Sequence, residues 1–244
     1  WTAREAIADT DEVLIVLGDT IFEADLGGFI HSPISLVGVQ EVQDPRLFGV
    51  AVVDDNGRVI STIEKPRIPK SNLALVGLYK IKEVPALIQA LNRMITTGEP
   101  RTNGEYHLAE GLTSMIEQGV EIRTLTVDKW FDCGKKESLI ETNRILLNRI
   151  SKDLPPYQFP NCVIEPPVFI AEGCVIENSI IGPNVAIAEN AVIRNSIVRE
   201  SILGAYSHLE SIILEGSIIG NDALLRGHSQ SVNIGDNTEI DFNS

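Results

Sequence analysis

The sequence lacks any apolar run of about 20 residues, the length that a helix needs to cross a bilayer, so we expect no membrane partner. Cysteine is also scarce: Cys133, Cys162 and Cys174 are odd in number and lack the spacing of metal ligands. Reduced thiols in a cytoplasmic protein explain this pattern most simply. Positive charge is in deficit, since 20 lysines and arginines stand against 34 aspartates and glutamates. The resulting formal net charge of −14 disfavours nucleic acid as the main partner.

The chain opens on a helical pattern that has no capping residue in front of it. In WTAREAIAD, Trp1, Ala3 and Ile7 can share one face from the first residue onward. A helix that starts without a cap predicts that further sequence precedes it.

A run of five apolar residues, Val13 to Leu17, ends at Gly18-Asp19. Its β-branched composition predicts a strand that is buried on both faces of a parallel sheet. Ligands bind outside the carboxyl ends of strands in such sheets, so Asp19 is a candidate catalytic carboxylate. The alternative is that Asp19 only ends the strand or caps the next element.

Strand and helix patterns alternate up to residue 152 and predict an α/β domain with a mostly parallel sheet. The WFDCG stretch at 130–134 is expected to form a turn. Further strands are expected at 34–42, 50–53, 59–63, 73–81 and 120–127, and helices at 84–95, 106–118 and 137–149.

The proline-rich segment 153–160 predicts a linker, and the pattern changes after it. Within 161–244, aliphatic residues recur every six positions, which is typical of a β-helix whose short strands each send one aliphatic side chain inward. The expected inward residues are Ile164, Ile170, Ile176, Ile181, Ile187, Ile193, Ile213, Ile219, Leu225, Ile234 and Ile240. The predicted domains are therefore 1–152 and 161–244.

Five stretches in a fixed order carry a resemblance to a known family. They are VLGDTIF (16–22), FGVAVVD (48–54), IEKPRIPKSNLALVGLY (63–79), NGEYHLAEGLTSMIEQG (103–119) and WFDCGKKESL (130–139). The chain resembles the sugar-1-phosphate nucleotidyltransferases, most closely the long glucose-1-phosphate thymidylyltransferase-like type. The resemblance implies an incomplete Rossmann-like nucleotidyltransferase domain followed by a left-handed parallel β-helix of hexapeptide repeats.

The resemblance also implies a reaction and a site. Such enzymes join a sugar 1-phosphate to the α-phosphorus of a nucleoside triphosphate and release pyrophosphate, which demands charge neutralisation and in-line positioning. Asp19 and Asp132 would bind Mg²⁺, and Lys65 would contact the sugar phosphate. The implied substrate-binding positions besides Lys65 are Phe48, Gly49, Glu64 and Leu75. Taken alone, Glu64 and Lys65 would read as a solvated strand end.

The chain departs from the family pattern in three places. The sequence contains no glycine-rich loop with an arginine and a downstream lysine, so we expect this chain by itself to lack turnover. Glu110 stands where aspartate is usual, and Cys133 where threonine is usual. Glucose 1-phosphate with dTTP or UTP are the favoured substrates.

Two other functions stay open at this point. The chain could be a non-catalytic regulatory or assembly protein that keeps a sugar-phosphate-binding remnant and a β-helix for oligomerisation. The β-helix could also be an acyltransferase, although that would call for more coils and a catalytic histidine. Exposed coil faces and open β-helix ends predict a homo-oligomer in either case.

Overall fold

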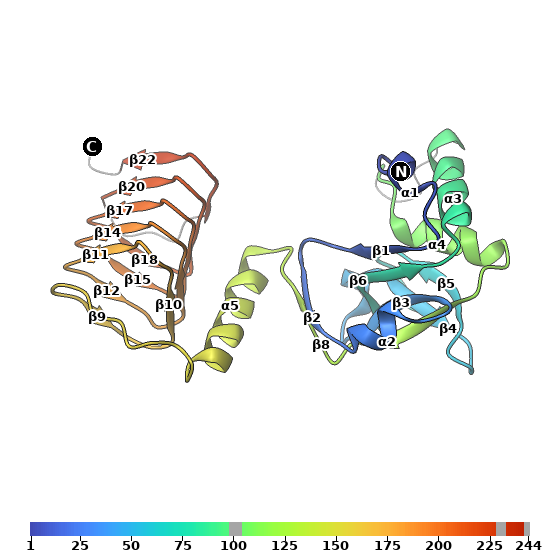
Figure 1. The fold of residues 1–244 in the computed structure, drawn as a ribbon, viewed down its shortest axis with the longest axis horizontal. Coiled ribbons are helices and arrows are strands. Elements are labelled where there is room, and N and C mark those ends of the chain that lie inside the picture. Colours follow the sequence, from blue (N-terminus) through green and yellow to red (C-terminus); the bar gives the residue numbers. More distant parts are fainter. Residues whose placement is uncertain (98–103, 228–232, 242–244) are drawn as a thin grey trace. The chain divides into compact units, whose positions relative to one another are not determined.

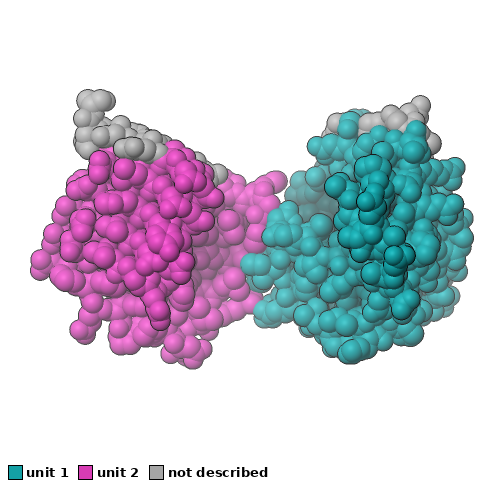
Figure 2. Space-filling view, turned by 45° about the horizontal axis from the view of Figure 1, so that its top comes forward, with its two compact units in different colours: residues 1–132 teal, residues 133–244 magenta. Residues whose placement is uncertain are grey.

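The computed structural model describes residues 1–97, 104–227 and 233–241 (Figure 1). The chain forms two compact units, residues 1–132 and residues 133–244 (Figure 2). Within the described residues, no helix combines the length and the apolar character that a membrane crossing requires.

The second unit begins earlier than the linker predicted at 153–160, because helix α5 (Lys136–Ile150) packs on the β-helix. The side-chain amide of Asn143 donates a hydrogen bond to the backbone oxygen of Asn184 at 3.2 Å. The side-chain amide of Asn148 donates a hydrogen bond to the side-chain oxygen of Asn184 at 3.3 Å. The sequence predicts α5 as the last helix of the first domain, whereas these contacts place it in the second unit.

The first unit is built on a six-stranded sheet with the order β5-β4-β6-β3-β7, to which β1 adds by pairing with β6. Its strands are β1 (Val13–Val16), β3 (Ser35–Glu41), β4 (Val50–Val53), β5 (Val59–Ile63), β6 (Leu73–Ile81) and β7 (Ile122–Thr126). Of the pairings described in this sheet, only β3–β7 is parallel. The sheet is thus mixed, and the expectation of a mostly parallel sheet is wrong. The tight hairpin between β4 and β5 permits only an antiparallel pair.

Strand β1 differs from the buried strand that its composition predicts. It pairs antiparallel with the second half of β6, and β4 occupies the same edge of β6 further along. Val13 and Ile15 pack against the core, whereas Leu14 and Val16 are 49% and 51% exposed. A β-branched composition is common to half-buried and fully buried strands, so it could not separate the two.

Helices cover the sheet and complete the cores of the first unit. Helices α3 (Val84–Thr97) and α4 (Leu108–Glu117) contribute Leu87, Leu112 and Met115 to one core. Phe29 of the short helix α2 (Leu26–Ile30) belongs to a second core with Leu78 of β6. Two further short helices in the described part of this unit are α1 (Arg4–Ile7) and the 3₁₀ turn Pro45–Leu47.

A two-stranded antiparallel ribbon, β2 (Thr20–Glu23) with β8 (Lys129–Asp132), lies beside this sheet. Thr20 pairs with Asp132, and Glu23 pairs with Lys129, whose ammonium lies 3.2 Å from the Glu23 carboxylate. The turn predicted at 130–134 is therefore wrong for residues 130–132, which form β8. This ribbon joins two motifs that are far apart in the sequence.

The second unit is a β-helix whose short strands form three parallel sheets, consistent with the expected left-handed β-helix (Figure 1). Its strands are β9 (Val163–Ile164), β10 (Val168–Ile170), β11 (Val175–Glu177), β12 (Ile180–Ile181), β13 (Val185–Ile187), β14 (Val192–Arg194), β15 (Ile197–Arg199), β16 (Ile202–Leu203), β17 (His208–Glu210), β18 (Ile213–Glu215), β19 (Ile218–Ile219), β20 (Leu224–Arg226), β21 (Asn233–Ile234) and β22 (Glu239–Asp241).

The coils of the β-helix become shorter along the chain. Paired residues are 17 apart at Val168 and Val185, and 16 apart at His208 and Leu224. The predicted inward residues from Ile164 to Ile193, and Ile219, Leu225 and Ile234 as well, belong to or pack against the core. Ile213 is the exception, since it is 47% exposed and its neighbour Leu214 points inward. The side chain of Ile240 lies outside the described residues.

The corners of the β-helix carry residues in the left-handed backbone region, where asparagine is tolerated better than most side chains. Asn161, Asn178 and Asn195 have φ values of 54°, 50° and 50° and occupy one corner of successive coils. Their side-chain amides stack, with hydrogen bonds of 3.0 and 3.3 Å between neighbours. The 17-residue recurrence of these asparagines is visible in the sequence and marks the corner.

Candidate active site

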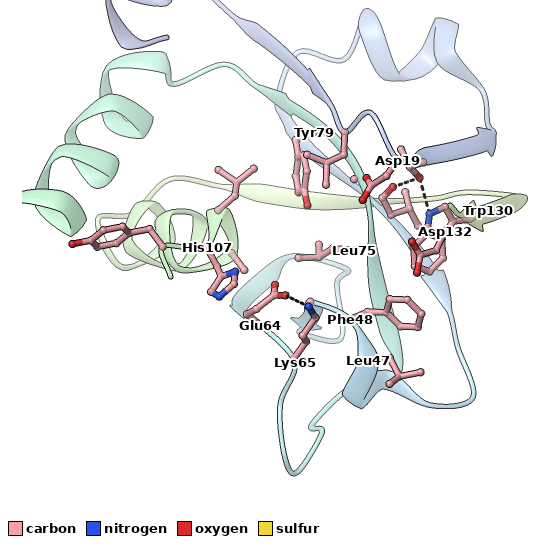
Figure 3. A pocket seen from close by; sticks show the side chains of 18 residues that line it. Asp19, Leu47, Phe48, Glu64, Lys65, Leu75, Tyr79, His107, Trp130 and Asp132 are labelled. Carbon is pink, nitrogen blue, oxygen red and sulfur yellow. Dashed lines mark hydrogen bonds and ion pairs between the residues drawn. The ribbon is translucent and has the colours of Figure 1, made fainter. Parts of the chain in front are cut away.

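A cavity of about 360 Å³ opens in the first unit, and all five motif stretches contribute to its walls. Asp19 and Asp132 lie on one side of it, and Glu64 and Lys65 lie on the other (Figure 3). The predicted site residues that line this cavity are Asp19, Phe48, Gly49, Glu64, Lys65, Leu75 and Asp132, which is every residue expected. The fold thus brings together residues that are up to 113 positions apart in the sequence, Asp19 to Asp132.

The acidic side of the cavity depends on the ribbon β2–β8. Asp19 immediately precedes β2, and Thr20, the first residue of β2, pairs with Asp132 at the end of β8. The Thr20 hydroxyl donates to the backbone oxygen of Val76 at 2.8 Å and accepts from Trp130 Nε1 at 2.7 Å. The two carboxylates therefore reach the cavity from adjacent strands.

The opposite side carries the ion pair that the EKP motif provides. Lys65 Nζ lies 3.7 Å from Glu64 Oε1, and the two side chains are 59% and 18% exposed. Lys65 has a φ of 40°, and its backbone N–H donates to the oxygen of Phe48 at 3.1 Å. An ion pair this long and this exposed holds its lysine weakly, so the ammonium is open to an incoming anion.

Gly49 lines the cavity next to Glu64 and Leu75. A Cβ at this position would lie 2.9 Å from Glu64 Oε2 and 3.3 Å from Leu75 Cδ1. The backbone oxygen of Gly49 accepts a hydrogen bond from the N–H of Leu75 at 2.8 Å. That N–H is consequently not open to a substrate, and the buried Leu75 side chain packs into the core. A larger residue at position 49 would displace the carboxylate of Glu64.

Comparison with known proteins identifies the family. The family model described as "Nucleotidyl transferase" matches residues 1–149, more than half of the chain. The chain belongs to the nucleotidyl transferase family. This confirms, at the level of the family, the resemblance that the five motifs carry.

Curated relatives of this chain have related names. "Low-salt glycan biosynthesis nucleotidyltransferase Agl11" of Haloferax volcanii is 34% identical over 59% of this chain and 40% of its own length. "Bifunctional protein GlmU" of Methanocaldococcus jannaschii is 33% identical over 71% of this chain and 40% of its own. "Glucose-1-phosphate thymidylyltransferase" of Streptomyces antibioticus is 30% identical over 69% and 48%, respectively. The chain spans at most about half the length of these relatives.

Tyr79 is a residue of the candidate site that the sequence reasoning missed. Its ring lines the cavity and is buried, and burial together with the nearby Glu64 carboxylate raises the pKa of Tyr79 to about 12. The phenol is therefore neutral at neutral pH and can donate a hydrogen bond. It lies four residues after Leu75, on the same face of β6, and this even spacing along a strand could have revealed it.

His107, Thr20 and Trp130 also line the cavity. The sequence excluded His107 only as a metal ligand, and its Nε2 lies 3.8 Å from Glu105 Oε2. Thr20 and Trp130 belong to the same motifs as the two aspartates, and Trp130 packs edge-on against Phe48 with ring centroids 4.9 Å apart. Proximity to a motif aspartate in the sequence was the only available signal for Thr20 and Trp130.

The candidate metal ligands of the site are two carboxylates, Asp19 and Asp132. No group of three or more histidine, cysteine, aspartate or glutamate side chains placed to hold a metal occurs in the described part of the chain. Asp19 and Asp132 offer hard oxygen donors on one wall of a cavity. Such a pair fits Mg²⁺, which takes one or two protein carboxylates and otherwise keeps water or phosphate oxygens.

Proposed function

We propose that this protein transfers a nucleotidyl group from a nucleoside triphosphate to a sugar 1-phosphate and releases pyrophosphate. The single observation that supports this best is the convergence of all seven motif residues on one cavity, with two carboxylates facing a glutamate–lysine pair. Joining two anionic substrates requires local positive charge in a protein whose net charge is −14. Lys65 and a divalent cation at the two aspartates would supply it.

Each residue has a stated task in this proposal. The ammonium of Lys65 holds the phosphate of the sugar 1-phosphate, and the carboxylate of Glu64 accepts hydrogen bonds from sugar hydroxyls. Gly49 leaves room for the sugar where a side chain would collide with Glu64. Phe48 and Leu75 form the apolar boundary of that space. Holding both substrates in line accounts for much of the rate in phosphoryl-type transfer.

Asp19 and Asp132 would hold the Mg²⁺ ion. The ion, when bound, neutralises charge on the phosphates as it builds up during transfer. The fit rests on the donor set, since two carboxylates leave most coordination positions to phosphate oxygens and water. No other ligand from the described residues is needed for this arrangement.

Glucose 1-phosphate is the proposed acceptor, with dTTP or UTP as the proposed donor. The name of the Streptomyces antibioticus relative, glucose-1-phosphate thymidylyltransferase, supports glucose 1-phosphate and dTTP, and UTP stays an expectation from the sequence. A homo-oligomer assembled through the β-helix stays a prediction. The non-catalytic alternative shares the sugar-phosphate site and differs only in the absence of turnover.

Pyrophosphate release tests this function. The 244-residue chain, and a version that carries the glycine-rich loop region of a family member at its N-terminus, are each assayed with glucose 1-phosphate, Mg²⁺ and each of dTTP, UTP, CTP and GTP. We expect Mg²⁺-dependent release by the version with the loop, fastest with dTTP or UTP, and none by the chain without it. Sugar-phosphate binding without release by the version with the loop would favour the regulatory alternative, and binding of neither substrate would refute the proposal.

A further inference from the structure

The ribbon that carries the two aspartates is too small to be stable by itself. Strands β2 and β8 have four residues each and form a sheet of their own, and an isolated two-stranded ribbon is marginal in water. Its geometry must therefore be fixed by contacts with the rest of the first unit. The direction in which Asp19 and Asp132 point depends on those contacts.

Thr20 makes such contacts in two directions at once. Its hydroxyl donates its single proton to the backbone oxygen of Val76 in β6, at 2.8 Å, and thereby ties β2 to the large sheet. The same oxygen accepts the indole N–H of Trp130 in β8 at 2.7 Å. Trp130 has no other polar hydrogen on its side chain, so Thr20 satisfies it completely.

The contact chain continues from Trp130 to the opposite wall. The indole packs edge-on against Phe48, with an interplanar angle of 67°. The backbone oxygen of Phe48 accepts the N–H of Lys65, next to Glu64. The Thr20 hydroxyl thus connects β2, β6 and β8 directly. It reaches the glutamate–lysine wall through the aromatic pair of Trp130 and Phe48, which are both labelled in Figure 3.

We propose that Thr20 is a positioning residue, whose hydroxyl clamps β2 between β6 and β8 so that Asp19 and Asp132 face the same cavity. Its importance for catalysis rests on the proposed function, in which these aspartates share one cation. The β-branched side chain supports the role, because it restricts χ1 and keeps the hydroxyl aimed at both partners. Loss of the hydroxyl leaves a partly buried indole N–H without its acceptor, which destabilises this arrangement specifically.

The test compares Thr20→Val, which keeps the shape and removes the hydroxyl, with Thr20→Ser, which keeps the hydroxyl. Thr113→Val is the matched control, since the Thr113 hydroxyl bonds to the backbone of Thr62 at 2.8 and 2.9 Å but lines no wall of the cavity. Divalent cation affinity is measured by titration of the full chain with Mg²⁺ and Mn²⁺. Fluorescence of Trp130 is read in a Trp1→Phe background, because the chain has only two tryptophans.

We expect Thr20→Val to weaken cation binding about 10- to 100-fold, the usual effect of losing a group that orients a metal ligand. The emission of Trp130 should shift in the same variant. Thr20→Ser should restore binding to within about threefold and should restore the emission, and Thr113→Val should change neither.

Distinct results would overturn the two proposals separately. Thr20→Val with cation affinity and Trp130 emission both unchanged would refute the clamp, as would an equal loss of affinity in Thr113→Val. Absence of cation binding by the unmodified chain would instead refute the proposal that Asp19 and Asp132 hold a divalent cation. In that case the emission of Trp130 in Thr20→Val still decides whether the hydroxyl holds β8.

Discussion

The two units of this protein differ in the sequence separation of the residues that they bring together. In the β-helix, each strand pairs with a strand one coil away, and the paired residues are 15 to 17 positions apart along the chain, as in the pair Ile218 and Asn233 and the pair Val168 and Val185. In the first unit, the cavity unites Asp19 with Asp132. Repetition therefore specifies a stable scaffold, whereas the chemistry is concentrated where distant segments converge.

Buried polar groups show the same difference. In the β-helix, the buried hydroxyl of Ser179 accepts the N–H of Ser196, and the hydroxyl of Ser196 accepts the N–H of Ile212 one coil further. Each of these two hydroxyls thus accepts a hydrogen bond from the backbone of the next coil. In the first unit, Thr20 satisfies groups on two separate strands. A substitution should consequently affect stability in one unit and function in the other.

The largest effect should come from Asp19→Asn or Asp132→Asn in the catalytically competent protein. We expect turnover to fall at least about 100-fold, because a carboxylate that holds the cation is lost from each variant. Thermal unfolding should change little, since neither side chain belongs to a core. Asp128→Asn, which alters an aspartate outside the cavity, is the control. Unchanged Mg²⁺-dependent turnover in either site variant would contradict the assignment.

Ile187→Asp should produce the opposite result, a loss of stability of about 4 kcal/mol or more. Ile187 is fully buried in β13 and lies between Ile170 and Leu203 in the stacked coils. Glu189→Lys, two residues away and exposed, should be nearly silent. Urea unfolding followed by circular dichroism compares the variants. Equal stabilities would mean that the inward register of the coils is wrong.

Lys65→Ala tests whether Lys65 contacts the sugar 1-phosphate and not the nucleotide. Loss of the ammonium should raise the KM for the sugar 1-phosphate about tenfold and leave the KM for the nucleotide within about twofold. Lys70→Ala removes an exposed charge from the same loop without touching the cavity and serves as the control. Steady-state kinetics with each substrate varied in turn provides the measurement. Equal changes in both KM values would argue against a phosphate contact at Lys65.

The smallest effect concerns Tyr79 and appears only at high pH. Burial raises the pKa of Tyr79 to about 12 in the folded protein, above the ordinary value of 10.0. The unfolded chain therefore loses the phenol proton first, and folding stability falls as pH rises from about 10 to about 12. Tyr79→Phe removes this loss, so at pH 11 the unmodified protein should lose about 1.4 kcal/mol more than the variant relative to pH 8.

Urea unfolding at the two pH values measures this difference. Tyr106→Phe, which removes an exposed hydroxyl at the rim of the same cavity, is the matched control. Parallel pH dependence of the unmodified protein and Tyr79→Phe would show that the phenol is not held neutral by its surroundings.

The sequence by itself determined the elements whose signal is local. The strands at 50–53, 59–63 and 73–81 have the predicted bounds, because turn residues and β-branched runs delimit each of them. The β-helix follows from the recurrence of aliphatic residues, although the side chain that points inward at 213–214 does not. A shift of one residue reverses which face a side chain occupies, and a six-residue pattern tolerates that error where a coil shortens.

Only the tertiary structure decided how the candidate site is assembled. The segments TIFE and KWFD are four residues long, and neither has a periodicity that announces its distant partner. Their pairing sets Thr20 opposite Asp132 and so brings the two aspartates to one wall. Likewise, the exposure of Leu14 and Val16 depends on which elements pack against β1 in the folded unit, and the sequence of β1 does not specify them. The motif residues were readable in the chain, but their convergence required contacts that no local pattern encodes.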